Sequence, residues 1–250
     1  MLSRLLSTLF GVYAMAMFGV VVLLLFAPLL IVAPGLPLRR AIGRACVRAW
    51  LAASLIPFRV RGLQHLPAGP CLVVCNHASY LDGIILTSAL PSRFTFLVQH
   101  GAADWPYVGL IIKRMGVTFV NRSSARGAAL VTRDLISRLK SGESFAVFPE
   151  GTFRRAPQLM AFQSGAFVIA SRAGVPVAPT VIRGTRRLFG EKQKLPRWSP
   201  VDIQVLPALQ PAGDSREAAN ALRDAARAEM LAHCGEADGL LVAAVEAPAP

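Results

Sequence analysis

The first 38 positions form the most apolar part of the chain, and no charged residue occurs between Arg4 and Arg39. As one straight helix, residues 5–38 would be roughly 50 Å long, whereas the hydrocarbon core of a bilayer is about 30 Å thick. Three prolines lie in the last third of this stretch, and proline interrupts helices. We therefore predict a spanning or deeply embedded helix over Leu5–Ala27, followed by an interfacial or re-entrant stretch over Pro28–Leu38.

After position 38, short apolar runs that are typical of strands alternate with longer segments of helical periodicity. The predicted strands are Cys71–Cys75, Phe94–Val98, Val117–Val120, Ser144–Phe148, Val177–Ile182 and Val201–Leu206. The predicted helices are Ala41–Ser54, Asp82–Leu90, Arg126–Lys140, Gly165–Ala173 and Ser215–Cys234. This alternation predicts an α/β fold, in which a mixed, largely parallel sheet is flanked by helices and preceded by the N-terminal membrane-embedded helical segment. We expect a membrane anchor over 1–38, a folded domain over 39–237 and a disordered tail over 238–250.

Composition adds a strong positive charge to this apolar chain. Of 250 residues, 54% are hydrophobic and only 16% are charged, yet Lys and Arg number 27 against 14 Asp and Glu. This apolar content excludes disorder of the whole chain, and the small charged fraction is unusual for a soluble domain. Membrane lipids with anionic headgroups are the expected partner. The sequence has no nucleic-acid-binding motif, and a membrane anchor explains the charge more simply. Four scattered cysteines indicate free buried thiols in a reducing compartment, without a metal site.

The distribution of arginines around the apolar stretch predicts the orientation of the chain. Only Arg4 precedes the stretch, whereas Arg39, Arg40, Arg44 and Arg48 follow it. The positive-inside rule then places the folded domain on the cytoplasmic face of the inner membrane. The four arginines could also bind anionic headgroups. A cleaved signal peptide is the competing interpretation, but the apolar core is too long and lacks a clear cleavage site.

Two polar loops follow predicted strands, where α/β proteins carry their reactive groups. In the first loop, Asn76–Asp82, His77 lies five positions before Asp82. The carboxylate could hold one imidazole nitrogen and leave the other as a general base. The alternative is a helix capping box formed by Ser79 and Asp82, with His77 as an ordinary turn residue.

The second loop, Pro149–Arg155, supplies a carboxylate, a glycine, a hydroxyl and two cations. Glu150 could accept hydrogen bonds from ligand hydroxyls, Gly151 allows close backbone approach, and the arginines could bind phosphate. The alternative is a surface turn with a solvated basic edge. Two such loops on one edge of a sheet favour catalysis.

Four blocks in order resemble the bacterial glycerolipid acyltransferase family, of the 1-acyl-sn-glycerol-3-phosphate acyltransferase type. They are Asn76-His77-x-x-x-x-Asp82 with Ser79, Gly116–Arg122, Phe148–Thr152 and Val175–Thr180. The resemblance implies a membrane-bound enzyme that moves a fatty acyl group from acyl-CoA or acyl-carrier protein to the free hydroxyl of a lysolipid. The acceptor would most simply be 1-acyl-sn-glycerol 3-phosphate, which gives phosphatidic acid.

The resemblance also implies roles for individual residues. His77 would be the general base and Asp82 the residue that orients it, in an acyltransferase domain that needs no metal and no cofactor. The residues implied in substrate binding are Asn76, Ser79, Arg122, Glu150, Gly151, Thr152 and Arg154.

Departures from the family pattern leave the acceptor open. Phe153 stands where the family usually has arginine, and Gln163-Ser164 and Gln99-His100 replace lysines. Either Arg154 compensates through a shifted loop, or the acceptor is another lysophospholipid or a lyso-ornithine lipid.

Three further interpretations concern the rest of the chain. A serine hydrolase would need a Gly-x-Ser-x-Gly elbow, and the only approximation, around Ser144, ends in alanine and begins a strand. A non-catalytic lipid-binding module is suggested by charge alone. The basic stretch Arg183–Arg197, followed by Trp198, suits anionic headgroups or the phosphates of coenzyme A, or is simply a solvated loop.

Overall fold

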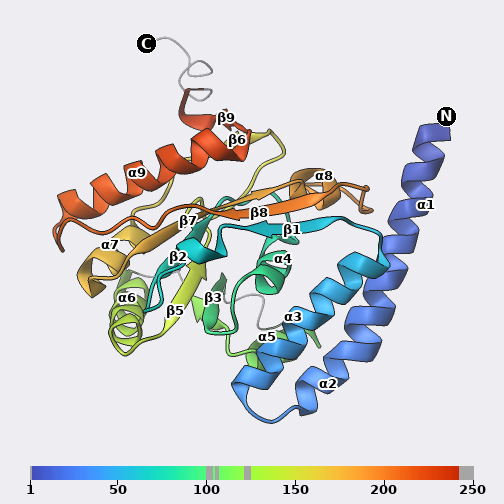
Figure 1. Cartoon of the computed structure of the whole chain (residues 1–250), viewed down its shortest axis with the longest axis horizontal. Coiled ribbons are helices and arrows are strands. Elements are labelled where there is room, and N and C mark those ends of the chain that lie inside the picture. Colours follow the sequence, from blue (N-terminus) through green and yellow to red (C-terminus); the bar gives the residue numbers. More distant parts are fainter. Residues whose placement is uncertain (1, 100–103, 105–106, 121–124, 242–250) are drawn as a thin grey trace.

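A seven-stranded sheet lies at the centre of the described chain (Figure 1). The computed structural model describes residues 2–99, 104, 107–120 and 125–241. The strand order is β1 (Phe58–Arg61), β8 (Val201–Val205), β7 (Val177–Arg183), β2 (Leu72–Cys75), β5 (Ser144–Val147), β3 (Phe94–Gln99) and β4 (Thr118–Val120). Neighbouring strands are parallel except β7 and β8. The predicted α/β fold and its six strands are confirmed. Strand β1 was not predicted, because it is an edge strand that carries two arginines and only half buries its side chains.

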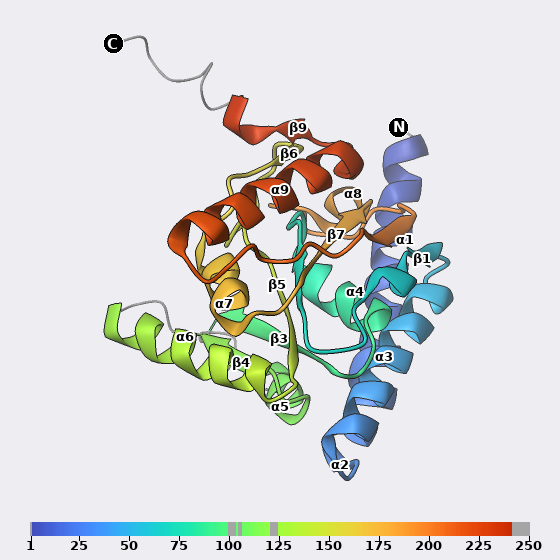
Figure 2. The same ribbon diagram turned by 60° about the vertical axis from the view of Figure 1, so that its left-hand side comes forward.

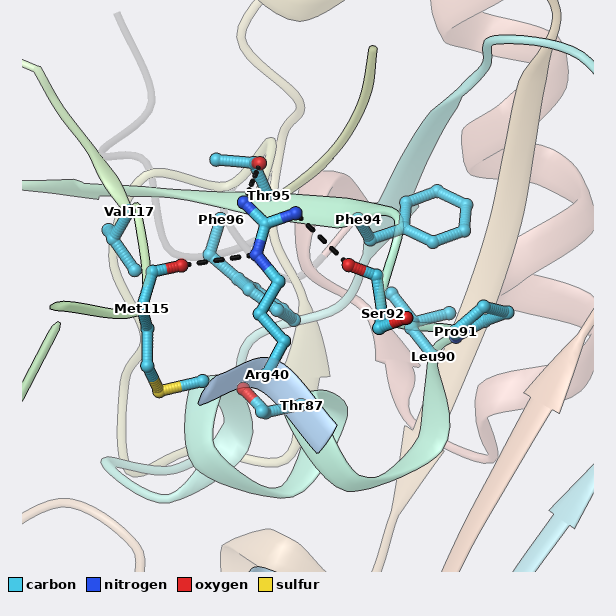
Figure 3. Close-up of a pocket in the computed structure, with 10 residues that line it drawn as sticks. All are labelled: Arg40, Thr87, Leu90, Pro91, Ser92, Phe94, Thr95, Phe96, Met115 and Val117. Atoms are coloured by element: carbon cyan, nitrogen blue, oxygen red, sulfur yellow. Dashed lines mark hydrogen bonds between the residues drawn. The ribbon is translucent and has the colours of Figure 1, made fainter. Parts of the chain in front are cut away.

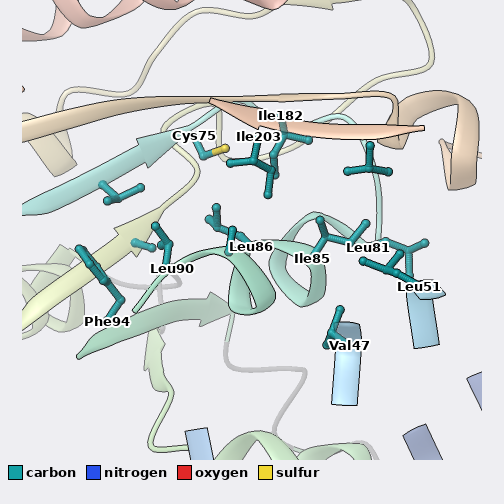
Figure 4. Packing of buried hydrophobic residues seen from close by; sticks show 14 of the residues in the cluster. Val47, Leu51, Cys75, Leu81, Ile85, Leu86, Leu90, Phe94, Ile182 and Ile203 are labelled. Carbon is teal, nitrogen blue, oxygen red and sulfur yellow. The ribbon is translucent and has the colours of Figure 1, made fainter. Parts of the chain in front are cut away.

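Two helical layers cover the two faces of the sheet (Figure 2). The helices are α3 (Leu36–Ala53), α4 (Asp82–Ala89), α5 (Val108–Arg114), α6 (Ala125–Lys140), α7 (Gly165–Ala173), α8 (Thr185–Phe189) and α9 (Arg216–Cys234). Side chains alternate across a strand, so Val73 and Cys75 of β2 face the layer of α3 and α4, whereas Leu72 and Val74 face α6, α7 and α9. Figure 4 shows the first of these two cores, in which α4 lies between the sheet and α3.

The apolar N-terminal segment is one continuous helix of 31 residues, Leu2–Val32, whose most apolar 18-residue window has a mean hydropathy of 2.8, and it is long and apolar enough to cross a membrane. It comprises α1 (Leu2–Met17), the π-helical stretch η1 (Phe18–Phe26) and α2 (Ala27–Val32). The predicted break at Pro28 is wrong. The amide of Ala27 donates to the Val22 carbonyl, five residues back, and this wider turn makes room for the proline ring. The chain reverses at Ala33–Gly35, and Leu36–Leu38 form the first turn of α3; the interfacial or re-entrant location of Pro28–Leu38 stays a prediction.

One side of this helix packs against the domain. The indole of Trp50 donates to the Ala14 carbonyl at 3.2 Å, and its ring meets Phe18 edge-on. Tyr107 donates to the Leu23 carbonyl at 2.7 Å. Val21 is part of the same buried cluster as β2 and α4. The predicted anchor therefore shares a hydrophobic core with the predicted domain, while the opposite side of the helix remains exposed.

The arginines of α3 are engaged within the protein. Arg44 and Arg48 donate to the carbonyl of Ser88 at 3.2 and 3.0 Å, at the C-terminal end of α4. Arg40 donates to the carbonyls of Met115 and Ser92, as Figure 3 shows, and Arg39 donates to a carbonyl of the preceding turn. These cations stabilise the negative end of a helix and close the hairpin. These bonds do not test the alternative role of the arginines as headgroup ligands, which stays a prediction, and Arg48 is exposed.

The ordered part of the C-terminus extends beyond the predicted boundary at 237. Ala237–Asp238 form strand β9, which pairs with β6 (Gln158–Leu159), and residues 239–241 continue as helix. Asp238 also forms an ion pair with Arg227. The predicted tail therefore begins too early. A strand of only two residues is too short to show a hydrophobic pattern in the sequence. Positions 242–250 lie outside the described residues.

The contact between α1 and the loop around Pro196 leaves no space for a side chain at Gly11. A Cβ atom there would lie 2.7 Å from the Pro196 carbonyl oxygen and 2.8 Å from the Leu195 Cβ. Gly11→Ala should lower the free energy of unfolding by about 1–3 kcal/mol in detergent micelles, measured by denaturant titration. Gly19→Ala is the matched control, because nothing lies within 4 Å of its Cβ position. Equal effects of the two changes would contradict this close packing.

Candidate active site

The two polar loops meet because β2 and β5 are adjacent parallel strands. Their register pairs Leu72 with Phe145 and Val74 with Val147, so both strands end at the same edge of the sheet. The loop after β2 carries His77, and the loop after β5 begins with Phe148. The two rings stack with centroids 4.3 Å apart. The expected meeting of the loops is thus present in the structure.

His77 and Asp82 form a hydrogen-bonded pair at the start of α4. The Nδ1 atom of His77 lies 2.8 Å from Oδ2 of Asp82, which also accepts the amides of Ala78 at 2.6 Å and Ser79 at 2.8 Å. Asp82 is fully buried. Because a carboxylate only accepts, Nδ1 carries the proton and Nε2 keeps its lone pair. Nε2 has no hydrogen-bond partner among the described residues. The Ser79 amide bond to Asp82 corresponds to one half of a capping box, although the residue that precedes α4 is Leu81, which forms no side-chain cap. The predicted contact between His77 and Asp82 is present, and the general-base role stays a prediction.

Aromatic rings enclose the imidazole of His77. Phe148 stacks on it, and Phe153 lies at 4.6 Å with a tilt of 59°. The Phe153 ring in turn meets Tyr80 edge-on at 4.8 Å, and Tyr80 lies 6.0 Å from the ring of Phe189. Tyr80 is 58% exposed, so this apolar wall opens to the surface. The position at which the family resemblance expects arginine therefore supplies part of an apolar wall.

Glu150 braces the site instead of lining it. It is buried, Oε1 accepts the amide of His77 at 2.6 Å, and Oε2 accepts the amide of Met160 at 2.9 Å. Each oxygen thus already accepts one main-chain amide, so Glu150 holds the scaffold of the site, and its binding of ligand hydroxyls stays a prediction. Burial raises the pKa of Glu150 to about 7, although the amide bonds from His77 and Met160 oppose this rise; nearby Glu236 adds to it.

Asn76 and Ser79 also hold the scaffold, contrary to their predicted role in substrate binding. The side-chain amide of Asn76 donates to the Ile182 carbonyl at 2.9 Å and accepts the Ile182 amide at 2.7 Å, which continues the pairing of β2 with β7. The hydroxyl of Ser79 donates to the Phe189 carbonyl at 2.7 Å. Both side chains are fully buried, so they shape the loop around His77 and do not contact a ligand.

The turn after Glu150 remains open to a ligand. Gly151, at φ +73°, closes the turn by donating to the Phe148 carbonyl, and this backbone conformation favours glycine. Gly151, Thr152 and Arg154 are exposed, and the side chains of the last two have no hydrogen-bond partner among the described residues. Arg122, the other predicted phosphate ligand, lies outside the described residues, as does His100.

The geometry of this site agrees with the comparison to known families. The family model described as Acyltransferase matches residues 57–183, half of the chain. The chain belongs to the acyltransferase family. A chloroplastic 1-acyl-sn-glycerol-3-phosphate acyltransferase of Brassica napus is 33% identical over 156 residues, 60% of this chain and 45% of that protein. A lyso-ornithine lipid O-acyltransferase of Pseudomonas aeruginosa is 33% identical over 148 residues, 58% of this chain and 55% of that protein. The chain thus spans about half the length of these relatives.

The fold of this acyltransferase also occurs in a crystal structure. The 1-acyl-sn-glycerophosphate acyltransferase of Thermotoga maritima superposes with a TM-score of 0.72 at 21% identity, over 91% of this chain and 95% of that one. The similarity includes the N-terminal region, since the matched part exceeds the residues after Val32. At this low identity the comparison supports the fold alone.

The hydrolase interpretation of Ser144 does not agree with its position in this acyltransferase. Ser144 begins β5, at the sheet edge opposite to Phe148, and is buried, with its hydroxyl oxygen accepting the Cys71 amide at 3.2 Å. It is therefore far from His77 along the strand. The four cysteines are free and buried, and no cluster of metal-ligand type occurs among the described residues.

Arg227 connects the C-terminal segment with the site, which the sequence analysis missed. It lies on α9 and is only 9% exposed. It donates to the carbonyls of Leu159 at 2.9 Å and Met160 at 3.1 Å and pairs with Asp238. The amide of the same Met160 bonds to Glu150, so a continuous series of hydrogen bonds leads from α9 to His77. Its position next to the apolar stripe of α9 was the signal that could have indicated a buried arginine.

The raised pKa of Glu150 predicts a pH dependence of stability. The folded protein binds this proton up to about pH 7, whereas the unfolded chain releases it near 4.5. The free energy of unfolding should therefore fall as the pH rises between these values, by on the order of 3 kcal/mol. In Glu150→Gln this fall should be absent, as measured by denaturant unfolding across the range. Glu217→Gln, an exposed change, should retain it; an identical pH profile of wild type and Glu150→Gln would refute the prediction.

Proposed function

We propose that this acyltransferase moves a fatty acyl group from an acyl thioester to the free hydroxyl of a lysolipid. The observation that carries the proposal is the His77–Asp82 pair, whose buried carboxylate engages Nδ1 and leaves Nε2 available. The donor is acyl-CoA or acyl-carrier protein, and the acceptor is 1-acyl-sn-glycerol 3-phosphate, which gives phosphatidic acid. The name of the Brassica napus relative supports this acceptor.

The residues of the pair divide the chemistry between them. Nε2 of His77 takes the proton of the acceptor hydroxyl as its oxygen attacks the thioester carbonyl. The new carbon–oxygen bond forms, the carbon–sulfur bond breaks, and the imidazolium returns the proton to the departing thiolate. Asp82 stabilises the imidazolium and holds its orientation, while Glu150 positions the main chain of His77. The transfer as written requires neither a metal nor a redox cofactor.

The reaction takes place at the cytoplasmic face of the inner membrane. The exposed side of the helix Leu2–Val32 lies in lipid, and the excess of arginines after it supports the cytoplasmic orientation. Because Trp50 and Tyr107 attach this helix to the domain, the domain lies directly against the bilayer. A lysolipid can then reach His77 without leaving the membrane surface.

One observation favours a second acceptor. Phe153 rests on His77 and on Tyr80, which gives the site an apolar wall where a phosphate monoester would prefer a cation. A lyso-ornithine lipid or another lysophospholipid is therefore the second candidate, and the Pseudomonas aeruginosa relative is named for such an acceptor. Arg154, exposed beside Phe153, is the residue that would bind phosphate in the first case.

The decisive test of the general base is acyl transfer by the purified full chain in anionic vesicles, with radiolabelled acyl-CoA or acyl-carrier protein. His77→Ala should lower kcat by about 10²- to 10⁴-fold, because the hydroxyl loses its base. Asp82→Asn should also lower it, whereas Ser144→Ala should retain it, which excludes a serine nucleophile. Full activity of folded His77→Ala would refute the mechanism, and no transfer by the wild type to any lysolipid would refute the function.

The acceptor is tested by Phe153→Arg, with lysophosphatidic acid and lyso-ornithine lipid as competing substrates. A guanidinium at this position should raise the ratio of kcat/KM for lysophosphatidic acid over lyso-ornithine lipid by about tenfold. Phe153→Leu removes the ring without adding charge and should leave this ratio nearly unchanged. If both variants change the ratio equally, the ring and not the missing cation determines the preference.

A further inference from the structure

Three exposed apolar side chains meet at the C-terminal end of α3. Tyr13 of α1 donates its hydroxyl to the Ala53 carbonyl at 2.6 Å, and Trp198 donates its indole N–H to the Leu55 carbonyl at 2.9 Å. Both donors satisfy carbonyl groups at the end of the helix, and the two aromatic rings remain on the protein surface. Tyr13, Leu55 and Trp198 are 42%, 73% and 47% exposed. We call these three residues the aromatic patch.

Leu55 occupies a backbone conformation that leucine rarely adopts. Its φ of +55° lies in the left-handed region, which is unfavourable for a residue with a Cβ atom. The side chain does not recover this energy by packing, because it is the most exposed member of the patch. A glycine would satisfy the turn without strain. A strained leucine that points to the outside indicates a partner for its apolar side chain.

Exposed cations without an ion-pair partner occur in the segment that leads to Trp198. Of the six cations in Arg183–Arg197, Arg183 pairs with Asp202 and Arg186 pairs with Glu236. The other four are exposed and have no ion-pair partner among the described residues; they are Arg187, Lys192, Lys194 and Arg197. Three of them, Lys192, Lys194 and Arg197, precede Trp198 in the loop 190–198, whereas Arg187 lies on α8. An apolar centre with a cationic margin is complementary to an anionic lipid surface, where alkyl groups lie beneath phosphates.

The loop 190–198 is also continuous with the apolar helix. Pro196 and Leu195 pack so closely on Gly11 of α1 that no Cβ atom fits between them. The exposed side of this helix next to the contact includes Leu9 and Val12. A bilayer that receives this side of α1 therefore also receives the aromatic patch.

We propose that the aromatic patch and the cations of the loop 190–198 form a second membrane contact, specific for anionic lipid surfaces. The proposal rests on the proposed location of this acyltransferase at a membrane and deepens it. The apolar tips enter the boundary between headgroups and acyl chains, and the cations bind phosphates. The loop follows α8, whose Phe189 accepts the Ser79 hydroxyl and borders Tyr80, so the contact places the open side of the active site next to the lipid.

The first experiment locates Trp198 directly. The full chain is reconstituted in vesicles of phosphatidylcholine and phosphatidylglycerol, and the emission of Trp198 is isolated as the difference between wild type and Trp198→Phe. Brominated lipids should quench this difference emission, and aqueous iodide should not. Quenching by iodide without quenching by brominated lipid would place Trp198 in water and overturn the proposal.

The second experiment uses the strain of Leu55. Leu55→Gly should retain or increase the free energy of unfolding in detergent, because glycine accepts a positive φ. Its transfer from micelles into phosphatidylglycerol-containing vesicles should nevertheless fall by about fivefold. Leu130→Ala, which changes another exposed leucine on α6 (60% exposed), is the control and should bind as wild type. Unchanged transfer of Leu55→Gly would overturn the role of the patch.

The third experiment tests whether these cations act through their position in the loop or only through the net charge of the protein. Lys192→Gln/Lys194→Gln/Arg197→Gln should lose most of the preference for phosphatidylglycerol over pure phosphatidylcholine vesicles. Arg133→Gln/Lys140→Gln/Arg172→Gln changes the same charge at exposed positions on α6 and α7 and should keep it. Equal losses would show that only net charge matters. Acyl transfer to a lysolipid in micelles is measured in parallel: its absence in wild type would refute the proposed function but not the quenching of Trp198.

Discussion

The buried carboxylate of Asp82 is the group on which the rest of the site depends. Burying a carboxyl group is costly unless hydrogen bonds compensate for the lost water, and here Oδ2 accepts His77, Ala78 and Ser79 together, whereas the buried Oδ1 has no partner among the described residues. That arrangement requires the loop to fold around the first turn of α4. It also requires α4 to stay in place, which Arg44 and Arg48 ensure from α3 by binding the carbonyls at its other end. The geometry of the imidazole therefore depends on the helical hairpin as well as on the loop.

Most polar residues of the site build its scaffold. Asn76 replaces a main-chain pairing with Ile182, and Glu150 joins the His77 amide to that of Met160, so polar groups that would be costly to bury satisfy one another. Arg227 extends this system to α9. The side chains left for a ligand are those at the rim, above all Thr152 and Arg154. Acceptor choice accordingly depends on the rim and on Phe153, while the position of the base depends on the scaffold.

The long N-terminal helix shares its inner side with the core of the domain and exposes its outer side. If that outer side lies in lipid, as we propose, the domain is held close to the bilayer surface. The aromatic wall at His77 and the aromatic patch at α3 are connected through α8 and the loop that follows it. An apolar acyl chain and a charged headgroup can then be received on one side of the molecule, which suits the transfer of an acyl group between two amphipathic substrates.

The sequence by itself determined six of the seven strands of the central sheet and the contact between His77 and Asp82. These strands followed from the hydrophobic periodicity. His77 and Asp82 meet because only five positions separate them across the start of one helix, so the local course of the chain brings them together. Only the tertiary structure decided the partners of Asn76 and Glu150, which lie 106 and 73 positions away, because sheet order brings those segments together. It also decided how the helix continues past Pro28, since the π-helical register depends on packing against Trp50 and its neighbours. Local patterns report which surface a residue prefers to bury; they do not identify the distant group that completes its hydrogen bonds.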